Sequence, residues 1–280
     1  MGEIKLIAFD LDDTIFNTKK ELTPETRRVL YKAAELGIEI VPSTGRFWGA
    51  VPDDIKNLPF VRYAVTLNGA AVYDVKNSRT IARFEIPVKR ADLIASVFDD
   101  LHVIYDAIIE GQGYMNRNLH ERIHEVAVGE WQYKIIHDLR KPVDDIHELM
   151  KSLDRGIQKM QIYTQDKELR KNLLAALPVV FPNNLFTSSI HNNIEINDLK
   201  ANKGDGLRFV ASHLGLDMSS TMAFGDGTND TSMIKAAGIG VAMGNAVQEL
   251  KDIADHVTET CDNDGVAEGI KTFCVGIDDK

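Results

Sequence analysis

The stretch Ile4-Lys5-Leu6-Ile7-Ala8-Phe9-Asp10-Leu11-Asp12-Asp13-Thr14 places a run of strand character directly before a group of acids. Much later in the chain, the strand-like run Thr221–Phe224 precedes Gly225-Asp226-Gly227-Thr228-Asn229-Asp230 in the same way. Parallel strands of an open α/β sheet end at a common edge, so we expect the two acidic groups to meet there. Gathered carboxylates repel one another unless a cation joins them, and Mg²⁺ with oxygen ligands meets that need.

The order of strand and helix patterns predicts the fold class. After the first strand, Thr23-Pro24-Glu25 is typical of a helix start, and the helical pattern over 26–36 ends at Gly37. Further strand patterns follow at 38–41 and 63–67. This alternation predicts an α/β protein with a Rossmann-like, doubly wound parallel sheet.

The pattern changes between residues 86 and 190, where no strand-like run ends in a cluster of acids. We expect helices at 91–101, 120–126, 143–153 and 167–177, and strands at 102–109, 157–164 and 179–181. The strand at 194–196 is expected to resume the first sheet. We therefore interpret 86–190 as an inserted α/β domain, and 1–85 with 191–280 as the catalytic core.

Composition narrows the class of protein. The 280 residues are 44% hydrophobic and 26% charged, which is typical of a soluble globular chain. A net charge of -10 argues against a nucleic-acid partner, and no apolar run reaches the ~18 residues of a membrane helix. Cys261 and Cys274 lack metal-type spacing, which favours a reducing, cytoplasmic location.

The spacing of the first acids suggests phosphoryl chemistry. Asp10 and Asp12 are two residues apart, so one carboxylate can attack a phosphoryl group while the other transfers protons. Lys203 and Thr44 are candidate donors to the phosphoryl oxygens, and Asp226 would complete a metal site. Each motif alone could be a turn, a helix cap or a surface lysine. Their order along the chain favours one shared site.

Four motifs, in this order, resemble the haloacid dehalogenase-like superfamily and, within it, the Cof-type sugar-phosphate phosphatases. They are Asp10–Thr14, Ser43–Arg46, Lys203-Gly204 and Gly225–Asp230, with further matches at Leu67–Ala70, Ala242–Ala246 and Asn263–Ala267. The resemblance implies Mg²⁺-dependent hydrolysis of small phosphorylated metabolites, such as sugar phosphates, through a phospho-aspartate. It also implies that the insert is a cap that excludes water and contacts the leaving group.

The resemblance implies a role for each matched residue. The catalytic set is the nucleophile Asp10, the general acid–base Asp12, the phosphoryl-orienting hydroxyl of Thr44 and the ammonium of Lys203. The metal set is Asp10, Asp12 through its backbone carbonyl, Asp226, and Asp230 as a partner that holds Lys203 and metal-bound water. The substrate-binding candidates are Arg46, Asn68 and Asn229. Ser43 offers a second hydroxyl beside Thr44, and Asp13 replaces the usual glycine, so we expect its side chain to be solvated.

Other functions stay open at this point. His120-Glu121-Arg122-Ile123-His124 fits the H-E-x-x-H pattern of zinc proteases, although it is expected to be a chance match on an exposed helix. A phosphomutase or phosphotransferase would use the same core, and a non-catalytic regulatory binding protein would keep only the fold. We expect a small phosphorylated metabolite as partner, no nucleic acid or membrane, and a monomer or homodimer.

Overall fold

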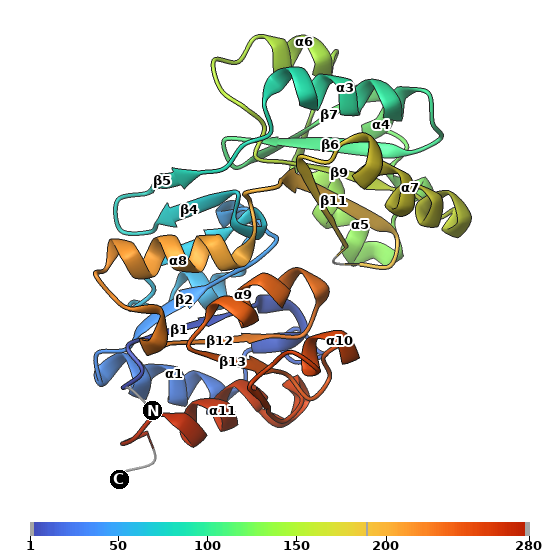
Figure 1. Cartoon of the computed structure of the whole chain (residues 1–280). Helices are drawn as coiled ribbons and strands as arrows, with labels where there is room; N and C mark the ends of the chain where they lie inside the picture. The colour runs from blue at the N-terminus through green and yellow to red at the C-terminus, as the bar shows by residue number, and fades with distance from the viewer. Residues whose placement is uncertain (1–2, 189, 278–280) are drawn as a thin grey trace. The chain divides into compact units, whose positions relative to one another are not determined.

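The protein is described here by a computed structural model that covers residues 3–188 and 190–277. The chain divides into two compact units (Figure 1). The first unit combines the residues up to Ala82 with those from Asn202 onward, and the second spans Arg83–Ala201. The predicted Rossmann-like α/β core with an additional α/β unit is confirmed.

The first unit is built on a five-stranded parallel sheet in the order β14-β13-β12-β1-β2. Its strands are β1 (Leu6–Phe9), β2 (Glu39–Pro42), β12 (Thr221–Gly225), β13 (Ile239–Ala242) and β14 (His256–Val257). Phe9 at the end of β1 lies opposite Phe224 on β12 and Pro42 on β2. The strand that precedes Asp10 therefore pairs with one strand from the N-terminal part of the chain and one from the C-terminal part.

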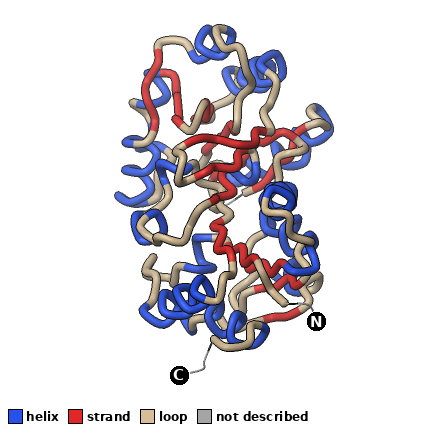
Figure 2. The backbone as a smooth tube through the Cα atoms, turned by 90° about the vertical axis from the view of Figure 1, so that its left-hand side faces the viewer, coloured by secondary structure: helices blue, strands red, loops and turns tan. Residues whose placement is uncertain are grey.

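Helices cover both faces of this sheet, as the uninterrupted burial of its inner strands requires. Figure 2 shows helices on both sides of the strands. On one face α1 (Pro24–Glu35) packs against α11 (Gly265–Phe273), and on the other α8 (Lys203–His213) packs against α9 (Thr231–Ala236) (Figure 1). The short helices α2 (Asp53–Lys56) and α10 (Gln248–Lys251) complete the unit. None of the helices among the described residues has the length and apolarity to span a bilayer.

A three-stranded sheet extends the first unit beyond β2. It contains β3 (Tyr63–Thr66), β4 (Ala71–Asp74) and β5 (Arg79–Arg83) in that order. The expectation that β3 belongs to the parallel sheet was only partly right, because a single parallel bridge joins Ser43 to Val65. The turn through Asn68, with φ of 58°, reverses the chain, so β3 forms its full ladder with β4 in antiparallel orientation.

The second unit has its own core around a six-stranded sheet in the order β10-β11-β9-β6-β7-β8. Its strands are β6 (Ile104–Ile109), β7 (Gln112–Asn116), β8 (Arg140–Val143), β9 (Lys159–Tyr163), β10 (Asn184–Thr187) and β11 (Asn193–Asp198). Its helices are α3 (Val88–Asp99), α4 (Arg117–His120), α5 (Gly129–Asp138), α6 (Ile146–Lys151) and α7 (Lys167–Val180).

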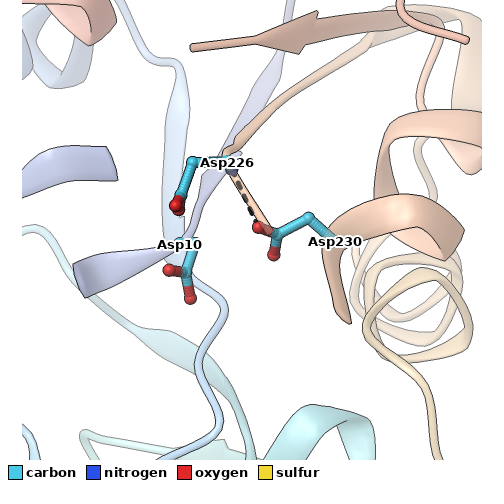
Figure 3. Close-up of side chains that lie close together, drawn as sticks. All are labelled: Asp10, Asp226 and Asp230. Atoms are coloured by element: carbon cyan, nitrogen blue, oxygen red, sulfur yellow. Dashed lines mark hydrogen bonds between the residues drawn. The ribbon is translucent and has the colours of Figure 1, made fainter. Parts of the chain in front are cut away.

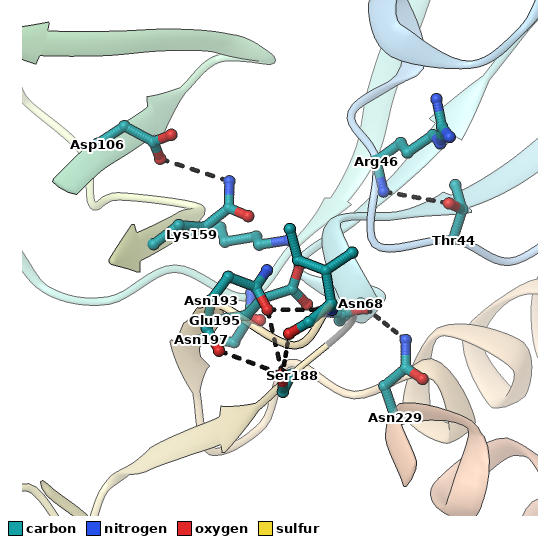
Figure 4. A network of polar contacts seen from close by, with 12 residues as sticks. Thr44, Arg46, Asn68, Asp106, Lys159, Ser188, Asn193, Glu195, Asn197 and Asn229 are labelled. Carbon is teal, nitrogen blue, oxygen red and sulfur yellow. Dashed lines mark hydrogen bonds and ion pairs between the residues drawn. The ribbon is translucent and has the colours of Figure 1, made fainter. Parts of the chain in front are cut away.

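One face of this second sheet is polar. Lys159 on β9 donates to Glu195 on β11 at 2.5 Å, and Arg140 on β8 donates to Asp106 on β6 at 2.8 Å. Near the start of β11, the hydroxyl of Ser188 donates to the backbone carbonyl of Asn193 at 3.1 Å (Figure 4). Two buried charged pairs therefore share this face of the sheet with apolar residues such as Ile104 and Ile108.

Three sequence predictions in the second unit were wrong. Strand 194–196 lies in β11, which pairs with β9 and so belongs to the second sheet rather than to the first. The expected strand 179–181 is largely the end of α7, which continues past Pro178 with Val179 and Val180 exposed. The expected helix 120–126 is broken, because α4 ends at His120 and a separate 3₁₀ turn follows at Ile123–Glu125.

We predict that Phe224→Ala destabilises the first unit. The Phe224 side chain is fully buried, and a Cβ added to Gly269 on α11 would lie 2.4 Å from its ring. Removing the ring leaves a cavity, so the free energy of unfolding should fall by about 3–5 kcal/mol in a urea titration. Val275→Ala, at a side chain that is 95% exposed, is the control and should change it by less than about 0.5 kcal/mol. An equal effect of both substitutions would contradict the packing described.

Candidate active site

Three aspartates meet where β1 and β12 end. Asp10 follows β1, Asp226 follows β12, and Asp230 ends the turn Thr228–Asp230 that leads into α9. Carboxylate oxygens of the three residues lie within 4.8 Å of one another (Figure 3). Asp10 and Asp230 are buried and Asp226 is partly exposed, so the group lies at an accessible edge of the sheet.

Lys203 supplies the positive charge closest to these acids. It is the first residue of α8, it is fully buried, and its Nζ donates to Asp10 Oδ1 at 2.5 Å and to Asp230 Oδ1 at 2.6 Å. Burial alone would lower the pKa of Lys203, but the charges of the two aspartates outweigh it and raise the pKa. The side chain is therefore a fixed ammonium at the edge of the sheet.

Asp230 also shapes the turn that carries Asp226. Its second oxygen accepts hydrogen bonds from the backbone N–H of Asp226 at 2.9 Å and of Gly227 at 3.0 Å. Gly225 permits this close approach, because a Cβ at that position would lie 2.4 Å from the Cβ of Asp230. Both carboxylate oxygens of Asp230 are thus engaged in holding Lys203 and the turn.

The charges of this group do not balance without a proton or a further cation. Three carboxylates share one ammonium, which leaves an excess of negative charge at the edge. Burial, followed by the charge of Asp230, raises the pKa of Asp226 to about 7. Burial likewise raises the pKa of Asp10 despite the opposing charge of Lys203. Oxygen ligands with excess negative charge fit a hard divalent cation, which Asp10 and Asp226 would hold.

The segment after Asp10 orients the carboxylate of Asp226, whereas the carboxylate of Asp12 has a different partner. Thr14 donates its hydroxyl hydrogen bond to Asp226 Oδ1 at 2.8 Å. The carboxylate of Asp12 instead accepts from Arg46, with Nη2 2.8 Å and Nε 3.0 Å away. Burial would raise the pKa of Asp12, but Arg46 and then Lys20 outweigh it and lower the pKa. The Asp12 carboxylate therefore lies outside the group of three acids.

The remaining predicted residues lie on three segments of the first unit: the loop after β2, the turn after β3 and the turn after β12. Thr44 Oγ1 accepts a hydrogen bond from the backbone N–H of Arg46 at 3.1 Å, and the Thr44 carbonyl accepts from the N–H of Asn68 at 3.0 Å (Figure 4). Asn229 donates to the side-chain oxygen of Asn68 at 3.4 Å. The hydroxyl of Ser43 is buried and, among the described residues, has no hydrogen-bond partner. Of the two adjacent hydroxyls, that of Thr44 is the one tied to the loop of Arg46.

The histidine pattern does not form a metal site. His120 closes α4 and its Nε2 contacts the carbonyl of His137 at 3.0 Å, whereas His124 Nδ1 contacts the carbonyl of Glu121 at 3.1 Å. Within the described part of the chain, the three aspartates of the first unit are the one group of three or more side chains placed to hold a metal ion.

Some contacts of the site have no signal in the sequence pattern that would have predicted them. The pairing of Arg46 with Asp12 and the bond from Thr14 to Asp226 join segments that are far apart in the sequence. The place of Thr14 within the first motif could have suggested that its hydroxyl lies at the site, but not that it donates to Asp226.

Comparisons with known proteins place the chain among enzymes that act on phosphate esters. A family model of haloacid dehalogenase-like hydrolase matches residues 7–270. The 5-amino-6-(5-phospho-D-ribitylamino)uracil phosphatase of Bacillus subtilis is 32% identical, with 96% of this chain and 95% of that protein aligned. The HMP-PP phosphatase of Serratia proteamaculans is 27% identical, with 94% and 93% aligned. The solved structure of a haloacid dehalogenase-like hydrolase from B. subtilis is 30% identical, with a TM-score of 0.79, and the match covers 96% of this chain and 99% of that chain.

We predict that a divalent cation raises the melting temperature of the protein and that Asp226→Asn removes this effect. Because the pKa of Asp226 is raised to about 7 when no cation is bound, a proton competes with the cation below that pH. Protonation of Asp226 should therefore weaken cation affinity by about tenfold per pH unit below 7. Thermal unfolding with Mg²⁺ or Mn²⁺ at about pH 6 and about pH 8 measures this.

Asp54→Asn is the matched control, since this carboxylate is exposed and pairs with Arg27 away from the three acids. It should respond to the cation as the wild-type protein does. A cation effect that survives in Asp226→Asn would place the binding site elsewhere.

Proposed function

The chain belongs to the haloacid dehalogenase-like hydrolases and is a phosphoric monoester hydrolase, and on this basis we propose that it hydrolyses small phosphorylated metabolites through a phospho-aspartate on Asp10, with Mg²⁺ as cofactor. The observation that carries the proposal is the buried Asp10 carboxylate held 2.5 Å from the ammonium of Lys203 at the end of β1. A nucleophile in this position has a fixed cation beside the oxygens of an incoming phosphoryl group. The first unit is then the catalytic core and the second unit the cap.

The first step transfers the phosphoryl group to Asp10. An oxygen of Asp10 forms a bond to phosphorus while the bond from phosphorus to the leaving oxygen breaks. The leaving oxygen takes a proton from Asp12, acting as the general acid. An Asp12 paired with Arg46 is ionised, so this step requires the pair to open and Asp12 to carry a proton.

The second step releases phosphate. The Asp12 carboxylate takes a proton from water, the water oxygen forms a bond to phosphorus, and the bond from Asp10 to phosphorus breaks. The proton given to the leaving group is thus returned to Asp12, and the enzyme is restored. An ionised Asp12, which the Arg46 pair favours, suits this step.

Neighbouring residues bind and orient the phosphoryl group in both steps. Lys203 neutralises its oxygens and Thr44 orients it through a hydrogen bond, while Arg46, Asn68 and Asn229 are the substrate-binding candidates. Mg²⁺, when bound by Asp10, Asp226 and the backbone carbonyl of Asp12, supplies further neutralisation of the phosphoryl charge.

We predict that Asp10→Asn lowers phosphatase activity by more than about a thousandfold while the protein stays folded, because the amide cannot act as the nucleophile. EDTA should abolish wild-type activity and added Mg²⁺ should restore it. Phosphate release and the circular-dichroism spectrum measure activity and folding, and Asp54→Asn is the control. Substantial turnover by Asp10→Asn would exclude the phospho-aspartate, and full activity in EDTA would exclude the metal.

A panel of phosphorylated metabolites tests the reaction class. It contains sugar phosphates, nucleotide phosphates and 5-amino-6-(5-phospho-D-ribitylamino)uracil, the last because a relative with 32% identity is a phosphatase for it. We expect metal-dependent release of inorganic phosphate from at least one compound. Formation of an isomer without phosphate release would instead indicate a phosphomutase, and no reaction at all by the folded protein would indicate a binding role.

A further inference from the structure

Two sequence motifs have no part in the reaction as described, yet both contact the segment that follows Asp10. Ala242–Ala246 lies at the end of β13 and in the loop after it, and Asn263–Ala267 forms the start of α11. Hydrogen bonds join the segment 13–26 to Asn245 and to the loop Thr260–Asp264, which lies between β14 and α11. We call these residues the brace.

Asn245 is the part of the brace nearest to Asp12. Its side-chain Nδ2 donates to the backbone carbonyl of Asp13 at 2.7 Å, and its Oδ1 accepts from the backbone N–H of Cys261 at 2.8 Å. Asp13 has a φ of 58°, so the chain changes direction at the residue directly after Asp12. A single amide thus ties this change of direction to a loop more than 200 residues away in the sequence.

The rest of the brace holds the following residues of the same segment. Asp262 Oδ1 accepts from the backbone N–H of Thr18 at 2.9 Å and from its hydroxyl at 2.8 Å. Asp264 Oδ1 accepts from the hydroxyls of Thr26, at 2.9 Å, and of Thr23. The loop that carries Asn245 also holds the second catalytic strand end, because the N–H of Val247 donates to the carbonyl of Asp226 at 3.0 Å.

We propose that Asn245 is a positioning residue that sets the orientation of Asp12 as general acid, through its hydrogen bond to the Asp13 carbonyl. This inference rests on the proposed function. Proton transfer requires the acid to lie within hydrogen-bond reach of the leaving oxygen, and a displacement of about 1 Å can cost about a hundredfold in rate. Once the pair of Asp12 with Arg46 opens for the first step, the position of Asp12 depends on its own backbone. Without the Asn245 donor the carbonyl of the neighbouring Asp13 loses its side-chain partner, and this part of the backbone is held less firmly.

The dependence of rate on the leaving group tests this role specifically. The value of kcat/KM reports the steps up to the first irreversible transfer, which here is formation of the phosphoenzyme. p-Nitrophenyl phosphate has a leaving group that departs without protonation, whereas an alkyl or sugar phosphate requires the general acid. A misplaced Asp12 therefore slows the second substrate far more than the first, and a general loss of structure slows both.

The experiment compares Asn245→Ala and Asn245→Asp with wild type, on p-nitrophenyl phosphate and on the best alkyl phosphate of the panel. We expect kcat/KM to fall about ten- to a hundredfold for the alkyl phosphate and by less than about threefold for p-nitrophenyl phosphate. Asn245→Asp keeps an acceptor for Cys261 but replaces the donor with a carboxylate oxygen that repels the Asp13 carbonyl, so it should show at least the same selective loss. Asn245 is exposed, so both variants should fold.

Asn77→Ala is the control, because Asn77 makes an equivalent side-chain hydrogen bond, to Asp74, in the turn between β4 and β5. In Asn77→Ala, the ratio of kcat/KM for the alkyl phosphate to kcat/KM for p-nitrophenyl phosphate should equal that of the wild type. Equal losses on both substrates in the Asn245 variants, or a wild-type ratio in Asn245→Asp, would overturn the inference. If the wild-type protein released no phosphate in this assay, the proposed function itself would be contradicted. The wild-type measurement therefore separates that outcome from a failure of the inference about Asn245.

Discussion

The buried ammonium of Lys203 is the constraint on which the rest of the first unit depends. A lysine without exposure is costly unless carboxylates surround it, and here two of them lie within 2.6 Å. The start of α8 must therefore reach the end of β1, and two glycines in its first turn allow the approach. A Cβ at Gly204 would lie 2.3 Å from the carbonyl of Ser232 on α9, and one at Gly206 would lie 2.4 Å from Val65 on β3.

The same constraint explains why the acids are arranged as they are. Asp230 is fully occupied by Lys203 and by the turn of Asp226, so it organises the edge without offering a free oxygen. Asp10 and Asp226 keep raised pKa values because burial and mutual repulsion are only partly relieved by one lysine. Carboxylates with excess negative charge favour a bound cation, and a bound cation in turn attracts the negative oxygens of a phosphoryl group.

Sequence reasoning predicted the parallel core sheet and the acids at its edge, because both follow from local patterns: an apolar run, then a polar residue where the strand ends. Thr221–Gly225 with Asp226 shows this directly. What it missed depends on partners far along the chain. β11 has an ordinary strand pattern, and only its ladder with β9 assigns it to the second sheet. The spacing of Asp10 and Asp12 predicted a shared reaction, but the bidentate contact of Asp12 with Arg46 could not be predicted from spacing.

The order of strands in the first sheet also determines when this protein can fold during synthesis. β1 lies between β2 and β12, so its second neighbour emerges from the ribosome only after the whole of Arg83–Ala201. Contacts between residues so far apart in the sequence form late in folding. The second unit, made of one continuous segment with its own core, is complete before them and can fold first. Until the C-terminal segment is made, the backbone N–H and C=O groups along one edge of β1 have no partner and its apolar side chains are incompletely covered, so the nascent chain is open to chaperone binding for that interval.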